Sequence, residues 1–234
     1  MEDKSGTIGV GNRYGNIRVD AIDEKVSTGR NRFVFFFVKR LFDIVSSLAA
    51  MIILSPVFLI IAIAVYIDNP GPVFFGHKRL GQHGRPIKVW KFRSMCMNAE
   101  EMIRSLPPEQ KAEYYKNFKL DNDPRITRVG AFLRKTSLDE LPQFFNVFIG
   151  DMSIVGPRPI VLRELEMYGD NKDKFLSMKP GITGNWQASG RSALTYENGR
   201  CEVELYYADH MSIWFDIKLL FKTVYVVLLQ RGAK

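Results

Sequence analysis

The stretch that decides the fold is LFDIVSSLAAMIILSPVFLIIAIAVYI, residues 41–67. Its only charged side chain is Asp43, near its start, and Asp68 follows just beyond its end. An apolar helix of about 20 residues is long enough to cross a bilayer. By length alone, residues 41–67 therefore predict a single membrane-spanning helix.

Two features favour a re-entrant helix-break-helix instead. Ser55-Pro56 falls in the middle of the stretch, where proline removes an amide donor and clashes with the carbonyl of Ile52. The first arm, up to Ser55, is about 22 Å long as a helix, shorter than the roughly 30 Å of hydrocarbon. Both flanks are basic, which a hairpin explains by keeping both on the cytosolic side. A spanning helix with a proline kink stays open as the alternative. The flanking basic residues are Arg32, Lys39, Arg40, Lys78, Arg79, Arg85, Lys88, Lys91 and Arg93.

The composition of the 234-residue chain excludes several classes of protein. Its 46% apolar and 12% aromatic content rules out global disorder. The net charge of +8 points to phosphates or an anionic membrane surface as partners. Two cysteines and three histidines, no two of them at metal-binding spacing, argue against a disulfide framework, zinc and haem.

The remainder of the chain predicts a helix-rich α+β fold. Residues 73–92 have the pattern of a β-hairpin around a Gly-rich turn, and residues 98–118 that of two short exposed helices. Residues 206–229 carry apolar side chains at helical spacing with Asp216, Lys218 and Lys222 among them. This pattern favours an interfacial amphipathic helix, with a core-facing helix as the alternative. We expect a flexible polar extension at 1–38, a re-entrant membrane hairpin at 39–68, and a small globular cytosolic catalytic domain at 69–234.

The most informative short motif is Ser137-Leu138-Asp139-Glu140. It has the spacing of a capping box, in which both acids would only stabilise a helix N-terminus. Pro142 conflicts with a helix that starts at Ser137, since its missing N–H would fall inside the helix. A helix that starts nearer Asp139 places both carboxylates at a helix mouth, close to basic residues. Carboxylates mixed with arginines suggest a metal-bridged diphosphate.

From about Lys39 to the end, the chain resembles the monotopic phosphoglycosyl transferases, bacterial sugar transferases that start glycan assembly on a polyprenyl carrier. Many ordered matches carry this resemblance, although each alone is weak. They are Lys39-Arg40-Leu41-Phe42-Asp43, Ser55-Pro56, Lys91-Phe92-Arg93-Ser94-Met95, Thr136-Ser137-Leu138-Asp139-Glu140-Leu141-Pro142-Gln143, Gly150-Asp151-Met152-Ser153, Val155-Gly156-Pro157-Arg158-Pro159, Lys179-Pro180-Gly181-Ile182-Thr183-Gly184, Trp186-Gln187 and Gly190-Arg191.

The resemblance implies a reaction, a cofactor and a location. Sugar-1-phosphate would pass from a nucleoside diphosphate sugar, usually a UDP-sugar, to polyprenyl phosphate, with UMP released and Mg²⁺ required. The enzyme would sit on the cytoplasmic face of the bacterial inner membrane, as the first membrane step of exopolysaccharide or capsule assembly. With no multi-helix region before Arg32, the chain resembles the minimal catalytic form. The sugar, the polyprenyl length, and the oligomeric state, for which a homodimer is one option, stay open.

The resemblance also assigns roles to residues. Asp139 would be the nucleophile that forms a covalent phosphosugar intermediate, and Glu140 would coordinate the metal. Glu204 would be a metal or sugar contact, with a solvated helix face as the alternative. The substrate-binding residues would be Lys91, Arg93, Arg134, Arg158, Gln187 and Arg191, with a plain structural role equally open for Gln187.

Two other functions compete. In one, the chain is a non-catalytic membrane-surface adaptor that binds anionic lipid, and the acids serve only as helix caps. In the other, the chain is a transferase that works by direct attack without an intermediate, for which one hydrophobic segment is too little scaffold. Nucleic acid is a poor candidate for a partner because no stacking motif or recognition helix is evident.

Overall fold

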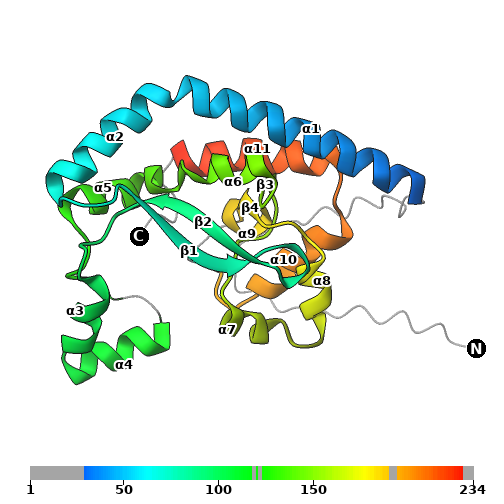
Figure 1. The fold of residues 1–234 in the computed structure, drawn as a ribbon. Helices are drawn as coiled ribbons and strands as arrows, with labels where there is room; N and C mark the ends of the chain where they lie inside the picture. Colours follow the sequence, from blue (N-terminus) through cyan, green and yellow to red (C-terminus); the bar gives the residue numbers. More distant parts are fainter. Residues whose placement is uncertain (1–28, 118–119, 121–122, 190–193, 229–234) are drawn as a thin grey trace, which may run out of the picture.

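The computed structural model describes residues 29–117, 120, 123–189 and 194–228. Two helices, α1 (Gly29–Ile53) and α2 (Ser55–Asp68), form a bent rod along one side of the molecule (Figure 1). The predicted break at Ser55-Pro56 is confirmed, and the two helices meet at 61°. Pro56 lies in the first turn of α2, where the missing N–H has no helical partner to lose.

The helix pair begins earlier than expected. Because α1 starts at Gly29, residues 29–38, which we assigned to the polar extension, are helical. The rest of that extension, residues 1–28, lies outside the described part of the chain. Within the described ranges, no single helix is long and apolar enough to cross a membrane, and α1 and α2 satisfy that test only as a bent pair.

The predicted β-hairpin is confirmed. Strands β1 (Phe74–Leu80) and β2 (Pro86–Phe92) are antiparallel, with Phe74 opposite Phe92 and Leu80 opposite Pro86, and the 3-10 turn η1 (Gln82–Gly84) joins them. A second pair, β3 (Ser153–Val155) and β4 (Gly181–Thr183), is parallel and was not expected from the sequence.

Short helices surround these strands. The two expected around residues 98–118 are present, and they extend away from the rest of the domain (Figure 1). The remaining elements are α3 (Ala99–Ser105), α4 (Pro108–Asn117), α5 (Arg128–Thr136), η2 (Leu138–Glu140), α6 (Gln143–Ile149), α7 (Leu162–Leu165), η3 (Glu166–Asn171), α8 (Lys172–Leu176), α9 (Asn185–Ala188), α10 (Arg200–Asp209) and α11 (Ile213–Leu228).

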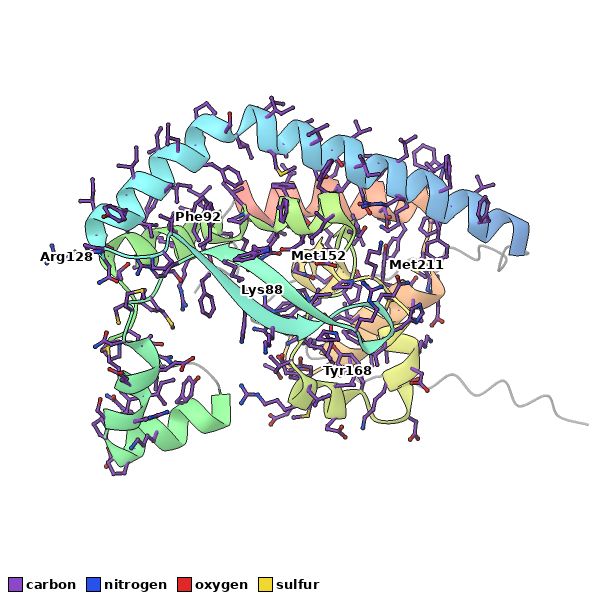
Figure 2. The ribbon with its side chains drawn as sticks, in the orientation of Figure 1. Lys88, Phe92, Arg128, Met152, Tyr168 and Met211 are labelled. Carbon is purple, nitrogen blue, oxygen red and sulfur yellow. The ribbon has the colours of Figure 1, made fainter. Side chains whose placement is uncertain are left out.

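Two apolar cores hold the domain together. The larger one packs β2, α6, β3, α10 and α11 around Val147, Met152 and Ile160, which are fully buried. The smaller one joins α2 to the hairpin and α5 through Val65, Phe92 and Leu133. Figure 2 shows Phe92 at the end of the hairpin beside α2 and Met152 in the middle of the domain. The membrane-type helix pair is therefore packed directly on the elements that surround the acid pair.

Polar side chains attach α1 to the domain. Asp43 is 2% exposed and accepts hydrogen bonds from the Ser153 hydroxyl (3.0 Å) and the Ile154 amide (2.8 Å). Arg40 donates to the carbonyls of Val147 (2.7 Å) and Phe148 (2.8 Å) at the end of α6. Hydrogen bonds to charged groups are worth about 1.5–3 kcal/mol, so these contacts hold α1 firmly. They explain why charged residues precede the apolar stretch.

Helix α11 has one buried and one exposed apolar face. Leu219 lies in the larger core, whereas Trp214 and Phe221 are more than 70% exposed. The alternative of a core-facing helix is thus correct for one side of α11, while the opposite apolar side is exposed. Asp216, which we read as one of the charges interrupting the helix, is buried and pairs with Lys39 of α1, while Tyr207 donates to it at 2.6 Å.

The Lys39–Asp216 pair yields a pH-dependent stability prediction. Burial raises the pKa of Asp216, while the charge and hydrogen bond of Lys39 lower it. In Lys39→Met the pKa rises further, and at neutral pH the folded protein buries an unpaired carboxylate, which costs about 3–5 kcal/mol. Since the folded state then binds a proton more tightly than the unfolded state, the lost stability returns as the pH falls through the raised pKa.

The measurement is the thermal midpoint in detergent at pH 8 and pH 5.5. We expect the deficit of Lys39→Met relative to wild type to be clearly smaller at pH 5.5. Lys218→Met, which removes an exposed lysine of α11, serves as the control and should change little at either pH. An equal deficit of Lys39→Met at both pH values would contradict the prediction.

Candidate active site

The chain changes direction at Ser137 in a way that brings the two acids together. Ser137 ends α5 in a left-handed conformation (φ 59°), and a single 3-10 turn, Leu138–Glu140, follows. Helix α6 begins only at Gln143, with Pro142 as its N-cap and no side-chain capping bond. The capping-box interpretation is therefore wrong, because no α-helix starts at Ser137. The two neighbouring acids instead lie in a short 3-10 turn between α5 and α6.

Lys91 is the point on which the acids converge. Its ammonium lies 2.6 Å from Glu140 Oε1 and 3.9 Å from Asp139 Oδ2. Lys91 belongs to β2, and β2 is held against α6 by Asn146, whose side chain donates to the Lys88 carbonyl (2.8 Å) and accepts from the Trp90 amide (2.9 Å). The hairpin and α6 thus fix the distance between the lysine and the acids.

Asp139 combines burial with nearby positive charge. Its side chain is 7% exposed, and burial raises its pKa, as does the charge of Glu140. Lys91 and Arg134 act in the opposite direction and favour the ionised form. Arg134 is held in turn by the Ser94 hydroxyl, 2.8 Å from its Nε. The carboxylate is therefore poorly hydrated and yet electrostatically supported, which is typical of a functional acid.

Arg93 contacts the end of the helix pair and not the acids, as far as the described residues show. It is 7% exposed, it donates to the Asn69 carbonyl after α2, and its Nη1 has no hydrogen-bond partner among the described residues. The close approach requires Gly71, where a Cβ would stand 2.8 Å from that nitrogen. Arg93 therefore connects the end of the helix pair to the residues that follow the hairpin. Its Nη1 remains available to donate a hydrogen bond, since it has no partner among the described residues.

The other predicted residues form a second group around Trp186. The Arg158 guanidinium lies 5.7 Å from the ring centroid of Trp186, and Arg200 lies over the same ring at 4.3 Å. Gln187 is buried, and its Oε1 has no hydrogen-bond partner among the described residues. Arg191 lies outside the described residues, so its predicted role is not placed.

Glu204 belongs to this second group and is almost fully enclosed. It is 1% exposed, so the alternative of a solvated helix face is wrong. The carboxylate accepts hydrogen bonds from the Tyr168 hydroxyl and, at 3.3 Å, from the Arg158 amide, and it pairs with Arg200 at 3.4 Å. Within the described ranges, no group of three or more His, Cys, Asp or Glu side chains is arranged to hold a metal ion.

The hairpin joins the two groups through residues that the sequence analysis did not single out. Side chains alternate along a strand, so His77 and Arg79 share one face of the hairpin with Lys91. Arg79 pairs with Glu164 at 3.1 Å, and the charge of Arg158 acts on Arg79. The signal was the period of two in Phe75-Gly76-His77-Lys78-Arg79, whose Lys78 and Arg79 we had interpreted only as part of the basic flank of the apolar stretch.

The sequence model for the bacterial sugar transferase family matches residues 34–230. The chain is 52% identical over 200 residues to an undecaprenyl-phosphate galactose phosphotransferase of Salmonella typhimurium, which covers 84% of this chain and 42% of that protein. It is 41% identical over 209 residues to the exopolysaccharide production protein ExoY of Rhizobium meliloti, covering 88% of this chain and 92% of ExoY.

A third relative is a UDP-glucose:undecaprenyl-phosphate glucose-1-phosphate transferase of Escherichia coli, 41% identical over 213 residues, which cover 88% of this chain and 42% of that protein. The chain spans about two fifths of the length of this relative and of the Salmonella protein, and nearly all of ExoY. The matched region includes the bent helix pair, the hairpin and both groups of site residues. The chain belongs to the bacterial sugar transferase family.

Proposed function

We propose that this chain transfers sugar-1-phosphate from a nucleoside diphosphate hexose to polyprenyl phosphate through a phosphosugar intermediate on Asp139. The observation that carries the proposal is the buried Asp139 carboxylate beside Glu140 and the Lys91 ammonium. The named activities of the relatives from Salmonella and Escherichia coli agree with it, since both act on undecaprenyl phosphate. The adaptor alternative loses support because neither acid caps α6, which starts only at Gln143.

The chemistry divides into two displacements at one phosphorus atom. An Asp139 oxygen attacks the sugar-bearing phosphorus, and the bond from that phosphorus to the bridging oxygen breaks, so that the nucleoside monophosphate leaves with the electron pair. A phosphate oxygen of the polyprenyl carrier then attacks the same phosphorus, and the Asp139 carboxylate is released. An aspartate at its reference pKa of about 3.9 is ionised at neutral pH. Burial raises the pKa of Asp139, while Lys91 and Arg134 favour its ionised form, so the proposed attack uses the carboxylate anion and needs no general base.

The obstacle to the first step is repulsion between like charges. A carboxylate and a phosphate oxygen 4 Å apart repel by about 1 kcal/mol in water and about 4 kcal/mol at an effective dielectric constant of 20. Lys91 and Arg134 lie close enough to Asp139 to offset part of this repulsion. Arg79 and Arg158, linked to Lys91 through the hairpin, provide further positive charge for the leaving phosphate.

The donor set fits a magnesium ion. Two carboxylates already converge on one cationic group, and Mg²⁺ is commonly held by one or two carboxylates together with substrate phosphates. Glu140, with Asp139 beside it, would hold the ion, which would supply positive charge to the diphosphate. Lys91 would then shift from Glu140 toward the phosphate. We propose that Glu204, whose oxygens already accept two hydrogen bonds and pair with Arg200, instead fixes the Arg158 turn.

We also propose that the helix pair enters and leaves the membrane on one side. The apolar part of α1, from Leu41 to Ile53, and the whole of α2 are each about 20 Å long, too short for about 30 Å of hydrocarbon. Both ends of the apolar stretch attach to the same domain: Asp43 bonds to β3 near its start, and Asp68, the last residue of α2, accepts from the Val129 amide at 3.0 Å. In this proposal, exposed apolar residues on α2 and on neighbouring elements lie against the lipid, and the acid pair lies at the cytoplasmic membrane surface. They include Leu59, Ile63, Phe132, Phe145, Phe148, Trp214 and Phe221.

The first test concerns the nucleophile. Detergent-solubilised protein is incubated with a UDP-hexose and Mg²⁺ without a lipid acceptor, and its intact mass is measured. We expect a phosphohexose adduct on the wild type and none on Asp139→Asn, because an amide cannot act as the anionic nucleophile. Asp151→Asn, which alters an acid at the turn after α6, should form the adduct like the wild type. Release of UMP by Asp139→Asn at the wild-type rate would refute the assignment.

The second test concerns topology. Single cysteines replace Phe33 and Lys78, both exposed, in a chain whose Cys96 and Cys201 are changed to serine. In oriented vesicles, a membrane-impermeant maleimide should label both positions from the same side. Ile53→Cys, 73% exposed at the bend, should resist the reagent from either side because lipid covers it. Labelling of the two flanks from opposite sides would show a spanning helix.

The third test separates a structural role of Glu204 from metal binding. Glu204→Ala leaves the buried Arg200 without its ion-pair partner and the Tyr168 hydroxyl and the Arg158 amide without their acceptor, which should cost about 3–5 kcal/mol of unfolding free energy. The thermal midpoint measures this loss, and Glu202→Ala on the exposed side of α10 is the control. An unchanged midpoint together with a strongly raised Mg²⁺ requirement for adduct formation would mean that Glu204 is a metal ligand.

A further inference from the structure

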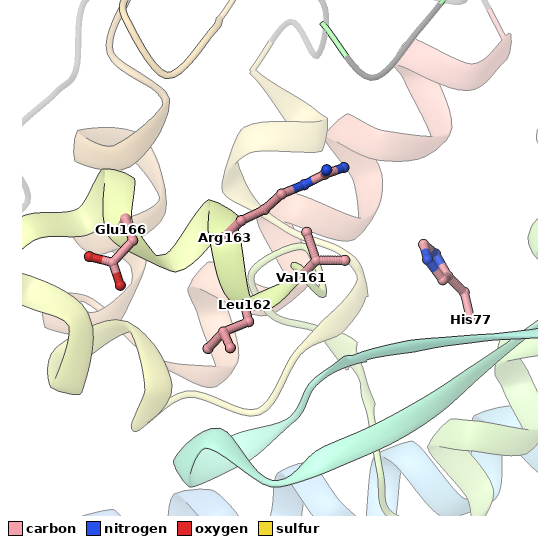
Figure 3. A pocket seen from close by; sticks show the side chains of 5 residues that line it. All are labelled: His77, Val161, Leu162, Arg163 and Glu166. Carbon is pink, nitrogen blue, oxygen red and sulfur yellow. The ribbon is translucent and has the colours of Figure 1, made fainter. Parts of the chain in front are cut away.

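A cavity of about 540 Å³, largely open to solvent, lies between the hairpin and α7. His77 of β1 forms one wall, and Val161, Leu162, Arg163 and Glu166 form the other. Figure 3 shows His77 across the open space from Val161 and Arg163. The function proposed above uses none of these five side chains.

The hairpin links the cavity to the acid pair. His77 is paired with Val89 in the hairpin, and Lys91 is paired with Phe75, so His77 and Lys91 are diagonal neighbours on one face. Diagonal neighbours in an antiparallel pair are about 7–8 Å apart. Lys91 in turn lies against both Asp139 and Glu140. A donor whose phosphorus lies at Asp139 therefore has the space beside His77 available for its non-reacting part.

His77 is neutral at physiological pH. Partial burial, together with the positive charges of Arg79 and Lys91, lowers its pKa to about 4. A neutral imidazole has one N–H donor and one acceptor nitrogen. Such a group is a poor choice for binding a phosphate, and the surrounding lysine and arginines already serve that purpose. It suits a hydroxyl group, which can accept from one nitrogen or donate to the other.

The opposite wall is fixed and chemically mixed. Glu164 accepts from the Val161 amide (2.9 Å), from Arg79 (3.1 Å) and from the Tyr196 hydroxyl (3.1 Å), so the start of α7 is tied to the hairpin. Val161 and Leu162 provide an apolar surface, and Arg163 and Glu166 provide polar groups at its edge. Apolar surface with a few well-placed polar groups is the usual composition of a small-molecule site, and here it matches a ring that carries hydroxyl groups.

We propose that His77 is a specificity-determining residue that hydrogen-bonds a hydroxyl of a sugar ring of the nucleotide donor held between β1 and α7. The proposal rests on the function proposed above, because it takes the donor to be a nucleoside diphosphate hexose. Two rings of such a donor carry hydroxyl groups, the hexose and the ribose. The chemistry recognised is the same, and the experiment separates the two sources.

Equilibrium binding is measured on the full-length chain in detergent, with Asp139→Asn as the parent so that no turnover occurs. The ligands are UDP-galactose, UDP-glucose and UDP. His77→Ala should weaken binding of at least one UDP-hexose by about fivefold to tenfold, the effect of one lost hydrogen bond. His77→Gln, which keeps a neutral donor and acceptor, should stay within about twofold of the parent. His83→Asn, at the exposed hairpin turn where φ is 57°, is the matched control and should bind like the parent.

Each outcome of the binding experiment supports or contradicts one assignment of His77. Weaker binding of a UDP-hexose with unchanged binding of UDP assigns His77 to the hexose, and equal weakening of both assigns it to the ribose. Unchanged binding of all three ligands by His77→Ala overturns the proposal. A wild-type chain that binds UDP-hexoses but forms neither adduct nor lipid product would instead overturn the proposed function. A parent that binds none of these ligands would overturn both.

Discussion

The left-handed turn at Ser137 is the constraint on which the site depends. Neighbouring side chains diverge by about 100° on an α-helix and by about 120° in a 3-10 turn, so helical geometry alone does not bring Asp139 and Glu140 together. The turn ends α5, and Pro142 delays α6 until Gln143, so the two acids occupy a single 3-10 turn. Strand β2 packs against this short turn, and its Lys91 contacts both carboxylates. The cost of one unfavourable backbone conformation is offset by the packing of Leu133 and Val147 on either side of the turn.

The site and the helix pair are mechanically one unit. Phe92, one residue after Lys91, packs with Val65 of α2 and Leu133 of α5. Gly130 allows α5 to approach the hairpin closely, since a Cβ there would stand 2.1 Å from the Ser94 carbonyl oxygen. Asp68 bonds to the first turn of α5. The position of the acids relative to the bent helices is thus set by direct contacts, which suits a reaction between a water-soluble donor and a lipid-borne acceptor.

Local patterns in the sequence predicted much of this architecture. The hairpin followed from alternating residues around a glycine-rich turn, and the break in the helix pair followed from Ser55-Pro56. The prediction of a capping box at Ser137 was wrong. The spacing of Ser137 and Glu140 does not show whether a helix follows, and Pro142 delays the start of α6 to Gln143.

The contacts between distant segments were beyond local patterns. Nothing near Glu204 indicates that Tyr168, 36 residues earlier, donates to it, or that Arg158 does so through its backbone. His77 and Arg79 carried a usable signal, since their shared face with Lys91 follows from the register of the hairpin once the turn is placed. The sequence analysis instead grouped Arg79 and Lys91 with the other basic residues that flank the apolar stretch, because composition does not distinguish the two faces of a strand.

The hydrogen bonds that attach α1 to the domain have a consequence for work with the purified protein. The carboxylate of Asp43 and the guanidinium of Arg40 complete the hydrogen bonding of the Ile154 amide and of two carbonyls at the end of α6. These main-chain groups are covered by α1, so deletion of the helix pair would expose them together with the apolar surface on which the helices pack. A water-soluble catalytic fragment therefore cannot be made by trimming at residue 69. Redesign for solubility has to retain the inner face of α1 and alter only the side that meets lipid.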